Sequence, residues 1–171
     1  LVTSQFTASV VLIIGTLVLY QQMRFIQQKK LGFEPAQVVA ITTIAAENKA
    51  QLDALIQNCR NLSSIESVCR AQTYPGKQAS GRSIYKPTDT ENGLGLLTNR
   101  VTADFEKVLG IKLLAGSTLP QKADGDTIVN VVLNKKAVDY LGLSPEEAIG
   151  KKVDCQLGNN TYVRGVVEDF H

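Results

Sequence analysis

The chain has 171 residues, a formal net charge of +2 at pH 7 and no tryptophan. Its basic residues are scattered, and no motif joins them to stacking aromatic side chains, so the composition argues against a nucleic-acid-binding protein. About 140 residues follow an apolar segment at the start, which is enough for one extramembrane domain with its own core, built as one lobe or two.

The apolar segment contains no acidic or basic residue between Leu1 and Met23. Because a helix rises about 1.5 Å per residue, roughly 20 apolar residues cross a bilayer core of about 30 Å. We therefore expect one continuous transmembrane and stalk helix from Leu1 to about Lys30, with Tyr20 at the interface and the Ser and Thr hydroxyls bonded one turn back. A signal peptide or a buried core helix fits less well, because polar and basic residues follow the run instead of a cleavage site. The missing initiator Met predicts a fragment of a longer chain.

The domain is expected to begin at Gly32 and Pro35, which together end the helix and turn the chain. The short run Val38 to Ile41 is apolar and rich in β-branched residues. This pattern predicts a buried strand.

The next segment predicts a helix that Asn48 and Gln51 would cap. Four side chains form its apolar face, at positions i, i+3, i+4 and i+7: Leu52, Leu55, Ile56 and Cys59. A strand from Ile65 to Thr73, ended by Pro75 and Gly76, would complete a strand-helix-strand unit.

Between Lys77 and Asn92 the chain loses its hydrophobic period. The wider segment 76–93 is either a mobile excursion or part of a second lobe. Order is expected again at Leu94 to Leu97. Thr102 would then cap a helix that Gly110 ends in a left-handed turn, and Ile111 to Leu114 would form the next strand. The apolar face of this helix would consist of Phe105, Val108 and Leu109.

The pattern then repeats: Ile128 to Leu133 predicts a strand, Asn134 caps a helix and Gly142 ends it. Ser144 to Glu147 combines an N-cap, a first-turn proline and a capping-box glutamate, and Gly150 would end that short helix.

The last predicted element is a hairpin. Val153, Cys155 and Leu157 alternate with polar residues, a turn follows at 158–160, and the strand Tyr162 to Val167 returns. Taken together, the predicted elements define an α+β fold.

No catalytic, cofactor-binding or metal-ligating residue can be assigned from the sequence. A phosphate-cradling loop and the G-x-S-x-G motif are both missing, and His171 is the one imidazole for a triad. Glu146 and Glu147 resemble a carboxylate pair, but helix capping explains them more simply. Two stretches fit an N-glycosylation acceptor or a simple turn: Asn61-Leu62-Ser63 and Asn159-Asn160-Thr161.

Three cysteines are present, Cys59, Cys69 and Cys155, without a C-x-x-C motif. With a single histidine, this set does not support a zinc site. Cys59 and Cys69 are either two core thiols or a disulfide closing a loop of about ten residues, which would contribute about 2–3 kcal/mol. Cys155 is expected to be free in both cases.

Several short motifs together resemble the FtsX-like, MacB-type permeases of ABC transporters. At the ends of the chain they are Gln5-Phe6, Leu31-Gly32-Phe33 and Gly165-Val166-Val167-Glu168-Asp169-Phe170-His171. Within the chain they are Pro75-Gly76, Ala103-Asp104-Phe105, Leu109-Gly110-Ile111, Leu114-Ala115-Gly116, Leu141-Gly142-Leu143 and Ala148-Ile149-Gly150-Lys151. Their order and spacing cover nearly the whole chain.

This resemblance implies a transmembrane and stalk helix over 1–31 and a periplasmic MacB-like core domain over 32–171, with a porter-like α/β lobe and a smaller variable lobe. The domain would be non-enzymatic, without a cofactor, and located at the inner membrane. It would transmit motion from a separate cytoplasmic ATPase subunit to a periplasmic partner, within a permease dimer. The basic residues Arg24, Lys29 and Lys30 would then lie outside, although the positive-inside rule applied to this flank alone places them in the cytoplasm.

Two other functions also fit a membrane span joined to an α+β domain. The first is the ligand-sensing ectodomain of a membrane receptor, which a signalling helix or kinase after His171 would distinguish. The second is a membrane-tethered hydrolase, which requires a catalytic partner near His171 and measurable turnover.

Overall fold

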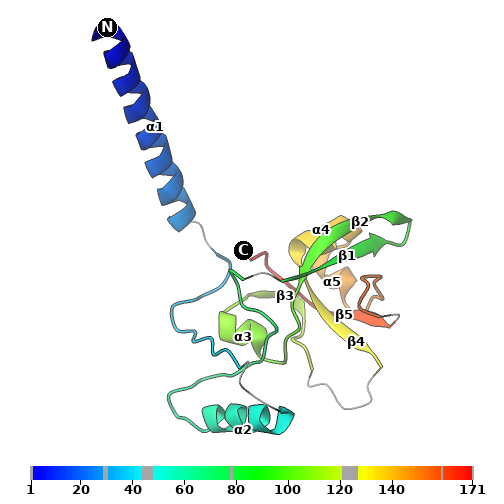
Figure 1. The fold of residues 1–171 in the computed structure, drawn as a ribbon. Helices are drawn as coiled ribbons and strands as arrows, with labels where there is room; N and C mark the ends of the chain where they lie inside the picture. Colours follow the sequence, from blue (N-terminus) through cyan, green and yellow to red (C-terminus); the bar gives the residue numbers. More distant parts are fainter. Residues whose placement is uncertain are drawn as a thin grey trace. The chain divides into compact units, whose positions relative to one another are not determined.

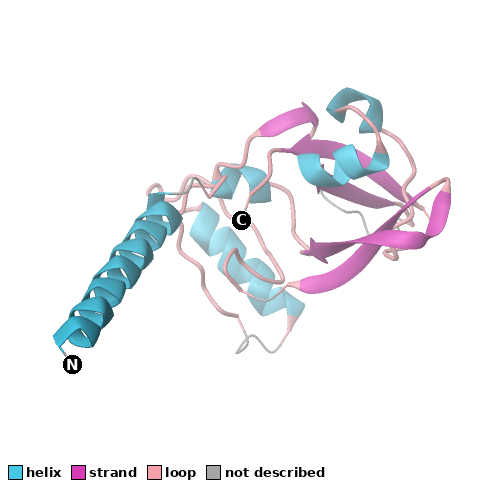
Figure 2. Ribbon diagram, turned by 90° about the horizontal axis from the view of Figure 1, so that it is seen from above, coloured by secondary structure: helices cyan, strands magenta, loops and turns pink. Residues whose placement is uncertain are grey.

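The computed structural model describes residues 2–28, 31–43, 48–77, 79–120, 127–158 and 160–170. The chain folds as two compact units, Leu1–Leu31 and Gly32–His171. Figure 1 follows the chain through both units, and Figure 2 separates helices, strands and loops by colour.

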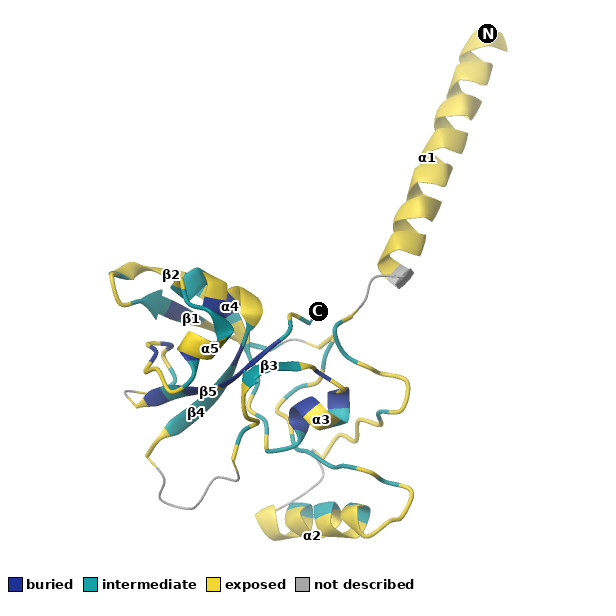
Figure 3. Cartoon of the chain, turned by 180° about the vertical axis from the view of Figure 1, so that it is seen from behind, coloured by how far each residue is buried: buried dark blue, intermediate teal, exposed yellow. Residues whose placement is uncertain are grey.

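The first unit contains one unbroken helix, α1 (Val2–Gln28), whose residues 2–26 are all exposed (Figure 3). The predicted continuous helix is therefore confirmed up to Gln28, and its expected end at residues 29–30 lies outside the described residues.

The second unit is α+β, as the sequence predicts. Its elements are α2 (Lys49–Arg60), β1 (Ser80–Lys86), β2 (Asp89–Thr98), α3 (Phe105–Leu109), β3 (Leu113–Gly116), β4 (Val129–Asn134), α4 (Lys135–Leu141), α5 (Pro145–Ala148) and β5 (Thr161–Val167). Strands β1 and β2 form an antiparallel hairpin. The other sheet has the order β3-β5-β4, in which the central β5 is antiparallel to β3 and parallel to β4.

The main hydrophobic core joins the β1–β2 hairpin to the three-stranded sheet and to α4 and α5. Ile84 of β1, Val138 of α4 and Val166 of β5 are all 0% exposed. Burying an aliphatic side chain of this size stabilises a fold by about 1.5–3 kcal/mol. The polar stretch around residues 76–93 is therefore largely a hairpin that closes the core.

A second, smaller core surrounds α3. Phe105, Leu109, Ile111 and Val167 are buried there, and Phe33 and Phe170 pack against them. Gly110 ends α3 at φ +65° and its N–H bonds back to the helix, so the predicted left-handed C-cap is confirmed.

The two strands predicted around α2 are wrong. Val38 to Ile41 and Ile65 to Thr73 form no strand, and within the second segment a single bridge joins Ala71 to Val101. Val39 is 83% exposed, whereas Val38 packs against the smaller core. An apolar β-branched run forms a strand only where a partner strand is available. The lack of such a partner overrides the intrinsic strand propensity of these residues. The helix between them, with its Asn48 cap, is confirmed.

Thr102 is not the N-cap of α3. Asp104 occupies that position at φ +72°, and the Thr102 Oγ1 accepts the Arg70 backbone N–H at 2.8 Å instead. The strand predicted from Ile111 begins at Leu113, because the Ile111 N–H is bonded to the Glu106 carbonyl oxygen at 2.8 Å.

The helix starts predicted in the last third of the domain and the end of α4 are confirmed, whereas α5 ends at Ala148 with Ile149 as its C-cap, one residue before the predicted Gly150. Asn134 Oδ1 accepts the Ala137 N–H at 3.2 Å, and Gly142 ends α4 at φ +74°. Ser144 and Glu147 form the reciprocal capping box, with distances of 2.8 and 3.3 Å.

The predicted terminal hairpin is present in reduced form. Residues 151–155 bond to β5 in places, with the Val153 N–H donating to the Thr161 carbonyl at 3.0 Å, but they form isolated bridges and no regular strand. The reason is that β3 occupies the edge of β5 at residues 165–167, which leaves only residues 161–163 open to this segment, and Asp154 then bridges to Tyr85 of β1.

Candidate functional site

The first candidate site is α1 itself. An 18-residue stretch within Val2–Ile26 has a mean hydropathy of 1.9 and none of it is buried, so this helix is long and apolar enough to cross a membrane. In a bilayer every polar group needs a partner within the protein. The hydroxyls of Thr7, Ser9 and Thr16 meet this requirement by donating to carbonyl oxygens four residues earlier, at 2.8–3.0 Å.

The polar end of α1 carries a pair of one aromatic and one cationic side chain. The Arg24 guanidinium lies 5.9 Å from the centre of the Tyr20 ring, within cation–π range. Aromatic and cationic side chains at one depth are typical of the membrane–water interface. The helix is therefore compatible with membrane anchoring.

The second candidate site is the place where the two ends of the Gly32–His171 unit meet. Gly32 has φ +78°, and a Cβ at this position would lie 2.5 Å from the Asp169 carbonyl oxygen and 2.8 Å from the Phe170 Cα. Next along the chain, the Glu34 N–H donates to the Leu109 carbonyl at 2.8 Å. The unit thus begins and ends on the same small core.

Polar contacts hold the C-terminal side of this junction. The Lys112 Nζ lies 3.0 Å from the Glu168 carboxylate, and the Glu168 N–H donates to the Lys112 carbonyl at 3.0 Å. Asp169 Oδ1 accepts the Lys136 N–H in the first turn of α4 at 3.0 Å. Residues 168–170 are therefore tied both to the residue that precedes β3 and to α4.

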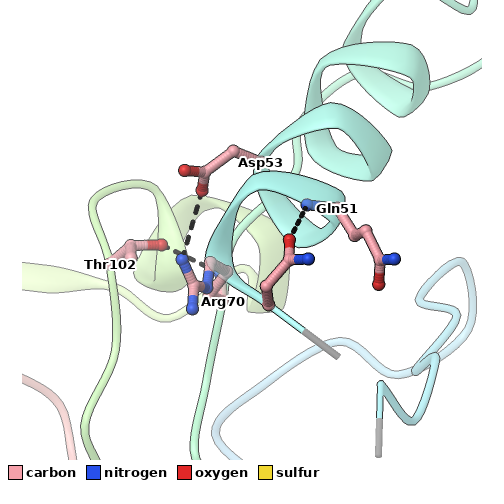
Figure 4. A network of polar contacts seen from close by, with 5 residues as sticks. Gln51, Asp53, Arg70 and Thr102 are labelled. Carbon is pink, nitrogen blue, oxygen red and sulfur yellow. Dashed lines mark hydrogen bonds and ion pairs between the residues drawn. The ribbon is translucent and has the colours of Figure 1, made fainter. Parts of the chain in front are cut away.

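A polar network connects α2 to the rest of the domain (Figure 4). Asp53 of α2 lies 3.4 Å from the Arg70 guanidinium. The Arg70 N–H donates to the Thr102 hydroxyl at 2.8 Å, and the Thr102 N–H donates to the Arg70 carbonyl at 2.9 Å. The two side chains of the ion pair are 41% and 52% exposed. An ion pair this accessible contributes about 0–1 kcal/mol, so the network positions α2 and offers no reactive group.

One buried acid stands out in the smaller core. Glu106 is 5% exposed, and its Oε2 has no hydrogen-bond partner among the residues that the structure describes. Burial raises the pKa of Glu106, and the neighbouring Asp104 raises it further. Glu147 differs, because hydrogen bonds from Ser144 in the capping box hold its pKa low. Sequence reasoning missed this residue, because a lone glutamate in a short helix looks like a surface residue.

All three cysteines are free thiols, so the bridge between Cys59 and Cys69 is not formed and the expected free Cys155 is confirmed. Burial raises the pKa of the Cys69 thiol, with Asp104 and Glu106 adding to the effect. Burial also raises the pKa of Cys155. A raised pKa lowers the fraction of each thiol that is present as the reactive thiolate.

The described residues hold no group of three or more His, Cys, Asp or Glu side chains able to bind a metal ion. His171, the potential triad imidazole, lies outside them, as does Asn159. Asn61 is the C-cap of α2, consistent with its interpretation as a turn residue. Comparisons with protein-family models, characterised proteins and solved structures return no match.

Proposed function

We propose that this chain is the membrane helix and extracytoplasmic domain of an FtsX/MacB-type ABC transporter permease. In this role it carries out no chemistry. It transmits the motion produced by a cytoplasmic ATPase subunit across the inner membrane to a periplasmic partner.

The observation that carries the proposal is the meeting of Gly32 with Asp169 and Phe170. A domain whose two ends lie together can be inserted between consecutive membrane helices, which pack about 8–10 Å apart, without forcing them apart. Both ends are fixed to one core through Phe33 and Phe170. A displacement of either membrane helix would therefore reach the domain directly.

The sequence resemblance supports the same proposal. Two of its three terminal motifs, Leu31-Gly32-Phe33 and the one that begins at Gly165, belong to the segments that meet at this junction. Another pair of motif glycines makes a close contact of its own: a Cβ at Gly116 would lie 2.4 Å from the Arg164 carbonyl oxygen, next to Gly165. These motifs therefore specify how β3, β5 and the chain ends pack.

The test is affinity purification of the full-length protein from its host membrane in mild detergent, followed by mass spectrometry. The proposal predicts further membrane spans after His171 and stoichiometric recovery of an ABC-type ATPase. A signalling helix or kinase domain in the same polypeptide, with no ATPase recovered, would instead establish the receptor ectodomain.

A further inference from the structure

A cleft of about 520 Å³ lies in the Gly32–His171 unit, away from the junction of the chain ends. Three parts of the fold form it: the turn of the β1–β2 hairpin, the end of α4, and the segment 151–158. We propose that this cleft binds a small amphipathic organic anion, with a phosphate or carboxylate head and an apolar body. The inference does not depend on the proposed transport role.

The positive charge of the cleft comes from Lys86, Lys151 and Lys152, against the single acid Asp154. None of these lysines belongs to the ion pairs found among the described residues. Their ammonium donors are therefore available to a ligand. Lysine ammonium groups and phosphate or carboxylate oxygens form charge-assisted hydrogen bonds, about twice as strong as neutral ones.

Two further acids lie near these lysines, Asp89 beside Lys86 and Glu147 beside Lys151. Each already accepts hydrogen bonds from its own turn. Asp89 Oδ1 accepts the Asn92 N–H at 3.0 Å, and Glu147 Oε2 accepts the Ser144 N–H at 2.8 Å. Neither residue lines the cleft, so the lining itself stays positive.

The Lys86 side chain and the Lys151 backbone are held in place before any ligand arrives. The Lys86 Nζ lies 4.7 Å from the centre of the Tyr140 ring, and the Tyr140 hydroxyl donates to the Asn92 carbonyl. The Lys151 backbone is fixed at both polar groups: its N–H donates to the Ala148 carbonyl at 3.1 Å, and its carbonyl accepts the Val163 N–H at 3.0 Å. Such preorganisation lowers the entropy lost on binding.

Tyr85 supplies a fixed aromatic wall. Its ring lies so close to Gly93 that a Cβ there would be 2.7 Å from Cε1, and its hydroxyl accepts a hydrogen bond from Gln156 Nε2 at 3.1 Å. Gln156 itself has φ +52°, a strained conformation for a non-glycine residue. Strain of this kind is typical of binding sites, where the surrounding structure maintains it.

The rest of the lining selects the kind of anion. Leu141, Leu143 and Val153 add apolar surface beside Tyr85, so an inorganic anion would leave the apolar side of the cleft unused. A volume of about 520 Å³ falls in the range of small-molecule sites. A charged head on the lysines with an apolar body on the leucines fits both sides.

The probe is 2-naphthyl phosphate, titrated by calorimetry into the full chain in nanodiscs of zwitterionic lipid, with empty nanodiscs as the blank. We expect one saturable site whose affinity falls as salt rises. Inorganic phosphate and uncharged 2-naphthol should each bind at least about tenfold more weakly, because each engages one side of the cleft.

Lys86→Gln and Lys152→Gln should each weaken binding about tenfold, the effect of removing one hydrogen bond to a charged group. Lys49→Gln is the matched control, because Lys49 lies on α2 outside the cleft. The affinity of this variant for 2-naphthyl phosphate should equal that of the wild type. Gln156→Gly should keep the fold, measured by circular dichroism, yet weaken binding because it frees Tyr85.

Adding anionic lipid to the nanodiscs separates two sources of the ligand. Competition with the probe identifies a lipid headgroup as the occupant, and unchanged binding identifies a soluble anion; either result supports the site. The proposal is overturned if naphthyl phosphate shows no saturable binding up to about 1 mM. It is overturned equally if the Lys86→Gln/Lys152→Gln double variant binds as tightly as the wild type.

Discussion

Replacing Gly32 by Ala tests the junction of the chain ends. A non-glycine residue in the left-handed region costs about 1–2 kcal/mol, and this applies to any glycine with a similar φ. At Gly32 the new methyl group also meets the Asp169 carbonyl oxygen and the Phe170 Cα at 2.5 and 2.8 Å. Backbone atoms cannot turn aside as a side chain can, so overpacking adds about 1–3 kcal/mol.

Gly142→Ala provides the matched control. Gly142 has φ +74°, close to the +78° of Gly32, but a methyl group added to it would meet no described atom within 4 Å apart from its immediate neighbours in the chain. It should therefore lose about 1–2 kcal/mol from conformation alone. The difference between the two variants isolates the contact between the chain ends.

The assay is urea unfolding of the full chain in nanodiscs, followed by circular dichroism and tyrosine fluorescence. With a slope of about 2 kcal/mol per molar urea, the extra loss lowers the midpoint of Gly32→Ala below that of Gly142→Ala by about 0.5–1.5 M. Equal midpoints for the two variants would refute the contact between Gly32 and the last residues of the domain.

Three further predictions concern the interior. Ile84→Ala should destabilise the domain by about 2–5 kcal/mol because Ile84 is 0% exposed. Leu97→Ala in the same hairpin, where Leu97 is 80% exposed, should change the free energy of unfolding by less than about 0.5 kcal/mol. Similar unfolding midpoints for the two variants would show that the hairpin is not part of the core. Burial raises the pKa of Glu106, so the protonated carboxyl is favoured in the folded state. The contribution of this proton to the stability of the fold is complete below the ordinary glutamate pKa and is lost as the pH rises through the folded-state pKa. Glu106→Gln should remove this dependence and raise the stability at pH 7 by about 1 kcal/mol, measured by unfolding at several pH values; a wild type that gains stability across that window would contradict the reasoning. Thiol titration of denatured, non-reduced protein should detect all three cysteines, and a single reactive thiol would mean that Cys59 and Cys69 are bridged.

The features that the sequence predicted correctly are those decided by nearby residues. The hydrogen bonds of the helix caps stay within one turn of their own helices, as at Asn134, Gly142 and the Ser144–Glu147 box. They can therefore be predicted from the local sequence. The charge-free run of α1 is equally local.

The features that were missed depend on distant partners. Val38 to Ile41 has strand-forming side chains but pairs with no strand in the described part of the chain, so it remains irregular. The β1–β2 hairpin has a polar sequence, but Leu94 and Leu96 alternate inward against the main core while Gly93 accommodates the Tyr85 ring. The cleft could not be predicted from the sequence either, because Lys86 and Lys152 are far apart in the chain and only the fold places them in one cleft.

The most direct test of the proposed function is the side of the membrane on which the domain lies. The three native cysteines of the full-length protein are replaced, and a single cysteine is introduced at Leu97, which is 80% exposed. Intact spheroplasts are then treated with a membrane-impermeant maleimide, with Ile13→Cys in α1 as the membrane control. We predict labelling at position 97 before lysis and none at position 13. Labelling at position 97 only after lysis would place the domain in the cytoplasm and contradict the proposed function.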